Sequence, residues 1–311
     1  MVVKTQNLVK RYGDLIALDH LNLEVHEGEI FGLLGPNGSG KTTAINCILS
    51  LLKYDKGSIE VFGKAMSPAA YDLKRDIGII MQNVAVFEEL TVLENIRYFC
   101  GLYVTDNKKR EELVEEAIDF VGLDDFRKFY PKKLSGGLLR RLNIACGIAH
   151  KPKLIILDEP TVAVDPQSRN AILEGIMRLN REGATVIYTS HYMEEVEQIC
   201  SRIAIMDKGR IVAAGTKDEL KAMINTGEKI TVEVFGVNCE TIEQGIRSLP
   251  GISSARCDGS VIHIKSQRSR SSLYDVMEYL KREGVGYGKI FCELPTLNDV
   301  FLEITGKQLR D

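Results

Sequence analysis

Residues 35–42 read Gly35-Pro-Asn-Gly-Ser-Gly-Lys-Thr42 and match the pattern G-x-x-x-x-G-K-[ST]. An apolar run, Ile30–Leu34, precedes them, and a helical pattern beginning at Thr42 follows. Glycines let the backbone curl so that its N–H groups point at an anion, and the helix N-terminus adds partial positive charge there. The stretch therefore predicts a strand, a phosphate-binding loop and a helix in an α/β domain.

This loop predicts a site for ATP. The Lys41 ammonium is expected to reach the β- and γ-phosphates, and the Thr42 hydroxyl to bind Mg²⁺. Further nucleotide contacts are expected from Gly35, Asn37, Gly38, Ser39, Gly40 and Thr43. The alternative is a glycine-rich turn that binds nothing, and the correct order of strand, loop and helix argues against it.

Two adjacent carboxylates end another apolar run. Lys153–Leu157 reads as a buried strand, and Asp158 and Glu159 follow it directly. Residues at the carboxyl edge of a parallel sheet emerge beside the bound ligand. We expect Asp158 to hold Mg²⁺, directly or through water, and Glu159 to polarise the attacking water. Taken alone, such a pair could equally be a surface turn.

Two more polar residues follow apolar strands. His191 comes after Thr185–Ser190, and Gln82 comes after Asp76–Met81. By spacing alone His191 is more often a structural hydrogen-bonding residue, and Gln82 an ordinary loop residue. They gain a functional interpretation only together with the other motifs.

The first two-thirds of the chain alternates short β-rich runs with longer helical patterns, which predicts a largely parallel sheet covered by helices. Thr91 followed by Glu94 predicts a helix-opening capping box, and Asp207–Arg210 predicts a tight turn between two strands. The expected strands are Glu29–Leu34, Asp76–Met81, Lys153–Leu157, Thr185–Thr189 and Ile203–Asp207. The expected helices are Thr42–Leu52, Val92–Tyr103, Arg110–Val121, Leu138–Ala149, Ser168–Arg181 and Met193–Cys200.

Near Asn225 the pattern changes, which predicts a nucleotide-binding domain over 1–222 and a small α+β domain over 228–306. The second domain reads as strand, helix, strand, strand, helix, strand, the order of a split β-α-β ferredoxin-like fold. The expected elements are Ile230–Phe235, Thr241–Leu249, Ser253–Cys257, Val261–Lys265, Ser271–Arg282 and Lys289–Leu294, with a closing helix at Leu297–Ile304. It has no obvious catalytic set, and His263 is expected to be an exposed strand residue. A regulatory or dimer-stabilising role is favoured over a passive extension.

Composition limits the possible partners. The 311 residues carry a net charge of -3 and are 44% hydrophobic, which fits a soluble globular protein and argues against a broad nucleic-acid-binding face. No apolar stretch approaches the ~20 residues that cross a bilayer, and the N-terminus lacks a secretory pattern. We therefore expect a cytoplasmic protein, with any membrane role supplied by a partner.

Leu134-Ser-Gly-Gly-Leu138 lies just before a helix that contains Arg140 and Arg141. With the phosphate loop upstream and Asp158-Glu159 downstream, it resembles the signature motif of ABC-type ATPases, and the resemblance covers residues 1 to about 220. It implies a mixed-sheet core, an antiparallel β subdomain and a helical signature subdomain. It also implies ATP hydrolysis.

The resemblance assigns further roles. Tyr12 resembles the aromatic residue that stacks on adenine, with a packed surface tyrosine as the alternative. Gln82 matches the glutamine that links the nucleotide, its metal and the transmembrane subunit. Asp165 matches the aspartate of the loop that crosses the dimer interface, and His191 the switch histidine that contacts the γ-phosphate.

Ser135, Gly136 and Gly137 open a helix, which leaves N–H groups free and allows close approach to an anion. In similar proteins this surface meets the γ-phosphate bound by the opposite subunit. A second nucleotide-binding domain is therefore implied, and a homodimer suffices. Two departures from the usual pattern are Leu138, often glutamine, and Ala163, more usually glycine; neither removes a phosphate, metal or water contact.

The segments Asp158–Arg169, His191–Glu197 and Pro295–Gly306 resemble exporter-type subunits of bacterial ABC systems related to drug- and antibiotic-export ATPases. The resemblance implies a separate polytopic membrane subunit and a peripheral position on the cytoplasmic face. One alternative is a soluble ABC-type ATPase acting on nucleic acid or ribosomes; a single nucleotide domain, no coiled-coil insertion and no basic excess argue against it. Another is a membrane-associated immunity or sensing subunit.

Overall fold

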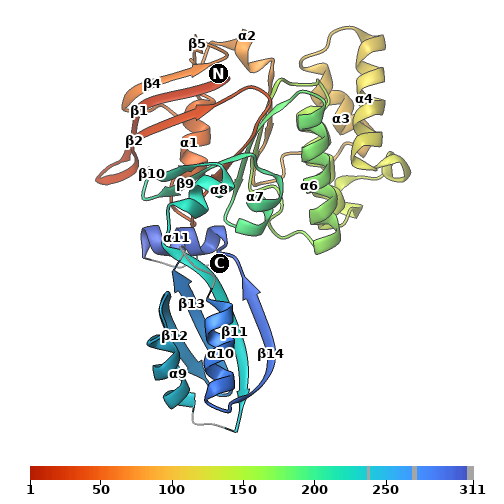
Figure 1. Ribbon diagram of the computed structural model, residues 1–311. Coiled ribbons are helices and arrows are strands. Elements are labelled where there is room, and N and C mark those ends of the chain that lie inside the picture. Colours follow the sequence, from red (N-terminus) through yellow and green to blue (C-terminus); the bar gives the residue numbers. More distant parts are fainter. Residues whose placement is uncertain (237–238, 268–271, 307–311) are drawn as a thin grey trace. The chain divides into compact units, whose positions relative to one another are not determined.

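The computed structural model describes residues 1–236, 239–267 and 272–306 (Figure 1). The chain divides into two compact units, of which the first holds Met1–Lys217 and the second begins at Asp218. Each unit has its own apolar core. Among the described helices, none combines the length and the apolar composition needed to span a bilayer.

A six-stranded sheet with the order β10-β9-β3-β8-β7-β6 forms the centre of the first unit. Its strands are β3 (Ile30–Leu34), β6 (Ile77–Ile80), β7 (Leu154–Asp158), β8 (Thr185–Ser190), β9 (Arg202–Asp207) and β10 (Arg210–Gly215). All neighbours are parallel except β9 and β10, so the predicted largely parallel sheet is confirmed. The predicted turn between β9 and β10 is also confirmed. Lys208 and Gly209 both have positive φ, 47° and 78°, as in a turn that matches the twist of a hairpin.

A second sheet in this unit is antiparallel, with the order β2-β1-β4-β5. Its strands are β1 (Val3–Tyr12), β2 (Leu15–Val25), β4 (Lys56–Val61) and β5 (Lys64–Ala65). Helix α1 (Lys41–Ile48) lies between the two sheets, and its residues Ala44, Ile45 and Ile48 are buried in their common core. This sheet is the antiparallel subdomain that the family resemblance implies.

Helices α3 (Val92–Gly101), α4 (Asn107–Val121) and α5 (Gly136–Ile148) enclose a second apolar cluster and form the helical subdomain (Figure 1). The capping box of Thr91 and Glu94 opens α3 as predicted. The remaining helices of the unit are α2 (Tyr71–Lys74), α6 (Pro166–Arg181) and α7 (Met193–Ile199), with short 3-10 turns at Asp124–Phe126 and Pro131–Lys133.

The predicted extent of the first helix is wrong at its C-terminal end. The helix stops at Ile48 rather than Leu52, because Ser50 has a φ of 54° and reverses the backbone. The N–H groups of Leu51 and Leu52 then both donate to the carbonyl of Asn46. This satisfies the end of the helix without continuing it.

The second unit contains an antiparallel sheet with the order β12-β13-β11-β14. Its elements are β11 (Thr226–Phe235), α9 (Cys239–Arg247), β12 (Ile252–Asp258), β13 (Val261–Gln267), α10 (Leu273–Arg282), β14 (Gly286–Glu293) and α11 (Leu297–Thr305), and they follow α8 (Lys217–Ala222), which begins at the last residue of the first unit's main segment. This order and alternation are those of the split β-α-β ferredoxin-like fold. His263 is exposed on β13, as expected, while the expected helix start at Ser271 lies outside the described residues.

Helix α5 approaches strand β6 closely because two glycines meet there. A Cβ added at Gly78 would lie 2.4 Å from the carbonyl oxygen of Gly147, and one added at Gly147 would lie 2.9 Å from the Ile80 side chain. Neither approach leaves room for a methyl group. The contact joins the helical subdomain to the parallel sheet.

We expect Gly78→Ala to lower the free energy of unfolding by about 1–3 kcal/mol, because the added methyl group separates α5 from β6. The measurement is the urea midpoint at unchanged slope. Gly101→Ala is the matched control, since its nearest neighbours are Arg110 side-chain atoms 3.4 Å away. Equal midpoints for Gly78→Ala and the wild type would show that the two elements are not held at this distance.

Candidate active site

Four neighbouring strands of the parallel sheet deliver the predicted site residues to one edge. The strands β3, β8, β7 and β6 are adjacent in that order. Their carboxyl ends lead respectively to the phosphate loop, His191, the Asp158-Glu159 pair and Gln82. In an open α/β sheet, ligands bind at this edge.

The phosphate loop, Gly35–Thr42, runs from the end of β3 into α1, and Asn37 and Gly38 are exposed at its tip. Gly40 precedes the helix with a φ of 107°, and a Cβ there would lie 2.6 Å from the carbonyl oxygen of Ala17 on β2. Only glycine fits that position. Because Gly40 has no side chain to cap α1, the first N–H groups of the helix stay available to an anion.

Lys41 is held at the base of this loop. Its ammonium donates to the carbonyl oxygens of Gly35 (2.8 Å) and Pro36 (3.3 Å), and it lies 3.2 Å from Glu159 Oε1. Lys41 is only 5% exposed and Glu159 only 6%. A buried ammonium therefore faces a buried carboxylate, and each compensates the charge of the other.

Thr42 and Asp158 are in direct contact. The Thr42 hydroxyl donates to Asp158 Oδ2 (2.8 Å), and the Thr189 hydroxyl donates to Asp158 Oδ1 (2.6 Å). A hydroxyl and a carboxylate oxygen at one point are hard-oxygen ligands of the kind that Mg²⁺ prefers. The donor set therefore fits the expected metal, which needs few protein ligands because it keeps several waters.

Glu159 is also the meeting point of the remaining predicted catalytic residues. The Gln82 amide donates to Glu159 Oε2 at 3.4 Å, and His191 Nδ1 lies 3.4 Å from the same oxygen. The backbone of Glu159 has a positive φ of 47°, and its N–H donates to the Thr189 hydroxyl (3.0 Å). Gln82, Lys41, Glu159 and His191 thus form one cluster, although they are far apart in sequence.

The sequence patterns did not predict that Arg140 and Thr189 contact the site. The Arg140 guanidinium donates to the carbonyl oxygens of Met81 (2.9 Å) and Glu159 (3.0 Å), which ties α5 to the backbone on both sides of the cluster. Burial lowers the pKa of Arg140, and the charge of Asp158 opposes that effect. Helical spacing is a signal that indicates the burial of Arg140, since this residue follows buried Gly137 by three positions and so lies on the same inward face of α5.

Ser135, Gly136, Gly137 and Asp165 form a second group. Ser135 caps α5 by accepting from Leu138 N–H, and Asp165 caps α6 by accepting from Ser168 N–H (2.9 Å). The Ser168 N–H holds the pKa of Asp165 below its usual value. A Cβ at Gly137 would lie 2.3 Å from the Ser168 hydroxyl on α6 and 3.2 Å from Asp165 Oδ2, so the signature helix packs directly against Asp165 and the start of α6.

The two departures from the family pattern both fit the structure. Leu138 packs against the apolar cluster of the helical subdomain. Ala163 has a φ of 59°, in the left-handed region that glycine adopts without steric cost. The usual glycine therefore reflects this backbone conformation, which the alanine preserves at a small energetic cost.

Tyr12 is not brought into either group. It ends β1, is 48% exposed, and lies under the ammonium of Lys10 at 5.1 Å from the ring centroid. Its strand pairs with β2, whose Ala17 carbonyl approaches the phosphate loop. The hairpin therefore reaches the site, while the tyrosine ring faces solvent.

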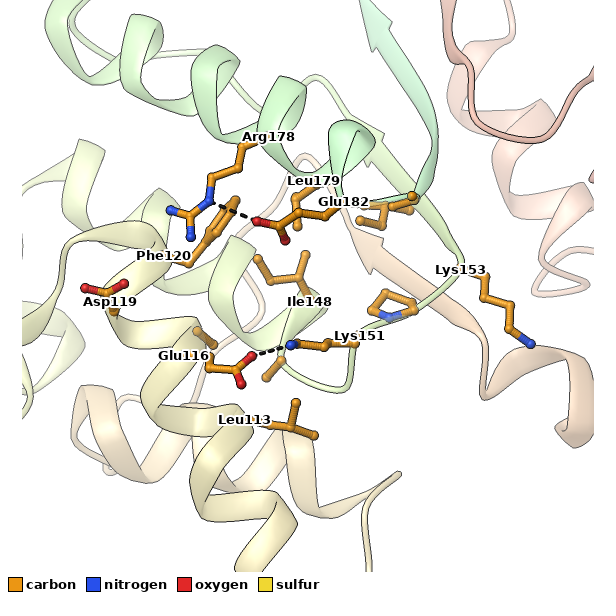
Figure 2. A pocket seen from close by; sticks show the side chains of 16 residues that line it. Leu113, Glu116, Asp119, Phe120, Ile148, Lys151, Lys153, Arg178, Leu179 and Glu182 are labelled. Atoms are coloured by element: carbon orange, nitrogen blue, oxygen red, sulfur yellow. Dashed lines mark hydrogen bonds and ion pairs between the residues drawn. The ribbon is translucent and has the colours of Figure 1, made fainter.

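A pocket of about 540 Å³ in the same unit lies elsewhere (Figure 2). It is lined by α4, the end of α6 and the residues just before β7 and β8, at the amino ends of these strands. Its cations are paired with carboxylates: Lys151 with Glu116, Arg178 with Glu182 and Lys153 with Asp76. This pocket does not offer the charge that a polyphosphate requires.

Comparison with known proteins gives a consistent result. The family described as ABC transporter matches residues 18–162. The linearmycin resistance ATP-binding protein LnrL of Bacillus subtilis (strain 168) is 38% identical over 100% of both chains. The Nod factor export ATP-binding protein I of Cupriavidus metallidurans (strain ATCC 43123 / DSM 2839 / NBRC 102507 / CH34) is 32% identical over 100% of this chain and 99% of its own.

Among solved structures, a dimeric ATP-binding cassette in a post-hydrolysis state with ADP and Pi superimposes with a TM-score of 0.63. It is 28% identical and covers 69% of this chain and 98% of its own. The matched fold, the full-length similarity and the phosphate-loop geometry agree. The chain therefore belongs to the ATP-binding, ATP-hydrolysing subunits of ABC transporters.

Proposed function

We propose that two copies of this chain bind ATP at their interface and hydrolyse it to drive export through a separate membrane subunit. The observation that carries the proposal is the convergence of Lys41, Thr42, Asp158, Glu159 and His191 at one sheet edge. These residues supply a cation that binds phosphate, ligands for a metal, a general base and a histidine that hydrogen-bonds the γ-phosphate, all within one cluster.

Each residue has a role that follows from its position. Lys41 would bind the β- and γ-phosphates, exchanging its loop carbonyl partners for phosphate oxygens. Thr42 and Asp158, assisted by Gln82, would hold Mg²⁺, which neutralises charge on the phosphate oxygens when bound. Glu159 would orient and deprotonate the attacking water, and His191, beside it, would hydrogen-bond the γ-phosphate.

A second copy would complete the site. Ser135 and Gly136 are exposed at the start of α5, and that helix start presents N–H groups to an anion. The chain has one phosphate loop and one signature motif, and a related cassette is known as a dimer. Tyr12, exposed on its hairpin, would then stack on adenine.

We expect Glu159→Gln to leave ATP affinity within about 3-fold of the wild type while kcat falls about 100-fold or more, because the amide cannot accept the water's proton. The same variant should accumulate as an ATP-dependent dimer in light scattering. Glu174→Gln, exposed on α6, is the control. Wild-type turnover in Glu159→Gln would remove this residue from the mechanism.

The membrane subunit is proposed to dock on the helical subdomain beside Gln82. A hollow of about 210 Å³ there is lined by Met81, Ala85, Phe99, Leu102 and Tyr103, among others. Near it four large apolar side chains, Val84, Phe87, Tyr98 and Leu102, are between 37% and 59% exposed, and the Phe87 ring contacts those of Tyr98 and Phe99. Exposed contiguous apolar surface of this kind marks an interaction site.

The loop that carries Val84 and Phe87 is held by the side chain of Asn95. Asn95, fully buried, accepts from the Phe87 N–H (2.8 Å) and donates to the carbonyl oxygens of Phe87 (2.9 Å) and Leu90 (3.0 Å). The loop begins at Gln82, whose amide contacts Glu159. A partner seated on the loop would therefore be coupled to the ATP site through one short backbone segment, Asn83–Asn95.

The direction of transport, the location and the C-terminal domain complete the proposal. Relatives named for drug resistance and for Nod factor export support export as the direction. Such a subunit would lie at the cytoplasmic face of the membrane, attached through its partner. We further propose a nucleotide-binding domain over 1–222 and a C-terminal domain over 228–306 that has a regulatory or dimer-stabilising role.

We expect Leu102→Glu to reduce co-purification of the chain with its membrane subunit about 10-fold or more from gently solubilised membranes, because a charge would replace apolar contact area. ATP hydrolysis by the isolated chain should stay unchanged. Leu51→Glu, equally exposed (62% against 59%) but outside the hollow, is the matched control. Undiminished co-purification of Leu102→Glu would place the membrane subunit elsewhere.

A further inference from the structure

A buried carboxylate outside the phosphate-binding cluster has an unusually full set of donors. Glu195 on α7 is 3% exposed. Its Oε2 accepts from the hydroxyls of Tyr188 (2.7 Å), Thr161 (2.8 Å) and Ser190 (3.0 Å). Three hydroxyl donors on one buried oxygen form a connected polar network, and truncating the carboxylate would remove the acceptor that all three share.

The other oxygen of this carboxylate faces a cation. Arg169 Nε lies 3.3 Å from Glu195 Oε1. The Arg169 guanidinium also lies over the Tyr192 ring, 5.1 Å from its centroid, and that ring lies 4.1 Å from the His191 ring. Contacts therefore run from Glu195 through Arg169 and Tyr192 to the side of His191.

The donors come from two separate loops of the site. Thr161 lies two residues after Glu159, at the start of the loop that leads to Asp165. Ser190 directly precedes His191, and its hydroxyl also accepts from Tyr192 N–H (2.9 Å). One carboxylate thus fixes the start of the Asp165 loop and the backbone on both sides of His191.

Burial, and next the charge of Glu195, raise the pKa of Tyr188 well above its usual value. Tyr188 therefore keeps its proton and remains a donor to the carboxylate. The network has a defined direction, in which the hydroxyls donate and Glu195 accepts. An amide at position 195 would keep only one accepting oxygen, so that, if this oxygen faces the three hydroxyls, the NH₂ group faces the Arg169 guanidinium and cannot accept from it.

We infer that Glu195 is a positioning residue for ATP hydrolysis, which holds His191 in register with the loop from Thr161 to Asp165. The inference rests on the roles proposed above for His191 and Asp165. Since the Asp165 loop packs on the signature helix at Gly137, contact with a second copy is transmitted through Glu195 to the histidine beside the γ-phosphate. The carboxylate itself touches neither nucleotide nor water in the reaction.

The test uses the full chain with Glu195→Gln, which preserves volume and removes the charge. We expect kcat to fall about 10- to 100-fold while the ATP dissociation constant, measured by competition with trinitrophenyl-ATP, stays within about 3-fold. Glu194→Gln is the matched control, because it is the exposed neighbour on the same helix. Its kinetic constants should equal those of the wild type.

A double-variant cycle with His191→Ala separates positioning from general stability. If Glu195 acts through His191, adding Glu195→Gln to His191→Ala should lower kcat by less than about 3-fold further. Should Glu195→Gln not fold, Tyr188→Phe removes one donor at constant volume, and it should lower kcat about 3- to 10-fold.

Three outcomes would overturn the inference about Glu195 and leave the role proposed for His191 intact. The first is a loss of kcat in His191→Ala whose fold-change multiplies with that of Glu195→Gln in the double variant. The second is wild-type kcat in a folded Glu195→Gln, and the third is wild-type kcat in Tyr188→Phe when Glu195→Gln does not fold. Wild-type turnover in His191→Ala would be a different result. It would refute the role proposed for the histidine, and with it the route assigned to Glu195. The two failures are therefore distinguishable.

Discussion

The rest of the site depends on the ion pair between Lys41 and Glu159. A buried ammonium must be compensated by nearby oxygens, and here two loop carbonyls and one carboxylate do this. Lys41 follows β3 and Glu159 follows β7, and β8 lies between these strands in the sheet. Because β8 runs parallel to both, it ends at the same edge and places Thr189 and His191 beside Asp158 and Glu159. Sheet order therefore fixes the chemistry.

The helical subdomain joins this cluster through backbone contacts rather than through charge pairs. The Arg140 guanidinium donates to two carbonyl oxygens, that of Met81, which precedes Gln82, and that of Glu159. Gly137 packs against Asp165, at the end of the loop that begins after Glu159. Positive φ angles at Glu159 and Ala163 give that loop its course. A rotation of the helices would therefore displace Gln82 and Glu159 together. The coupling proposed between a membrane subunit and ATP hydrolysis needs such a link.

Sequence patterns predicted some elements better than others, for physical reasons. The parallel strands were predictable because they are buried on both faces and read as continuous apolar runs between turn residues. The antiparallel sheet β2-β1-β4-β5 came only from the family resemblance, because register shifts after Thr5 and a positive φ at Asn7 interrupt the alternation along β1. In the C-terminal unit alternation is regular along β13, and its strands and helices follow the predicted order.

The sequence by itself determined the features that are local. Three motifs consist of consecutive residues, namely the phosphate loop, the acidic pair after a strand and the Ser-Gly-Gly that opens a helix. They are local because their chemistry needs a particular backbone conformation at one place. Only the tertiary structure decided which distant side chains meet: Gln82 and His191 at Glu159, Arg140 at two carbonyl oxygens, and Glu195 beneath three hydroxyls. Such contacts depend on strand order and on which helix face is buried. The identity of an arginine or a glutamate in the sequence does not tell whether its side chain is buried or exposed.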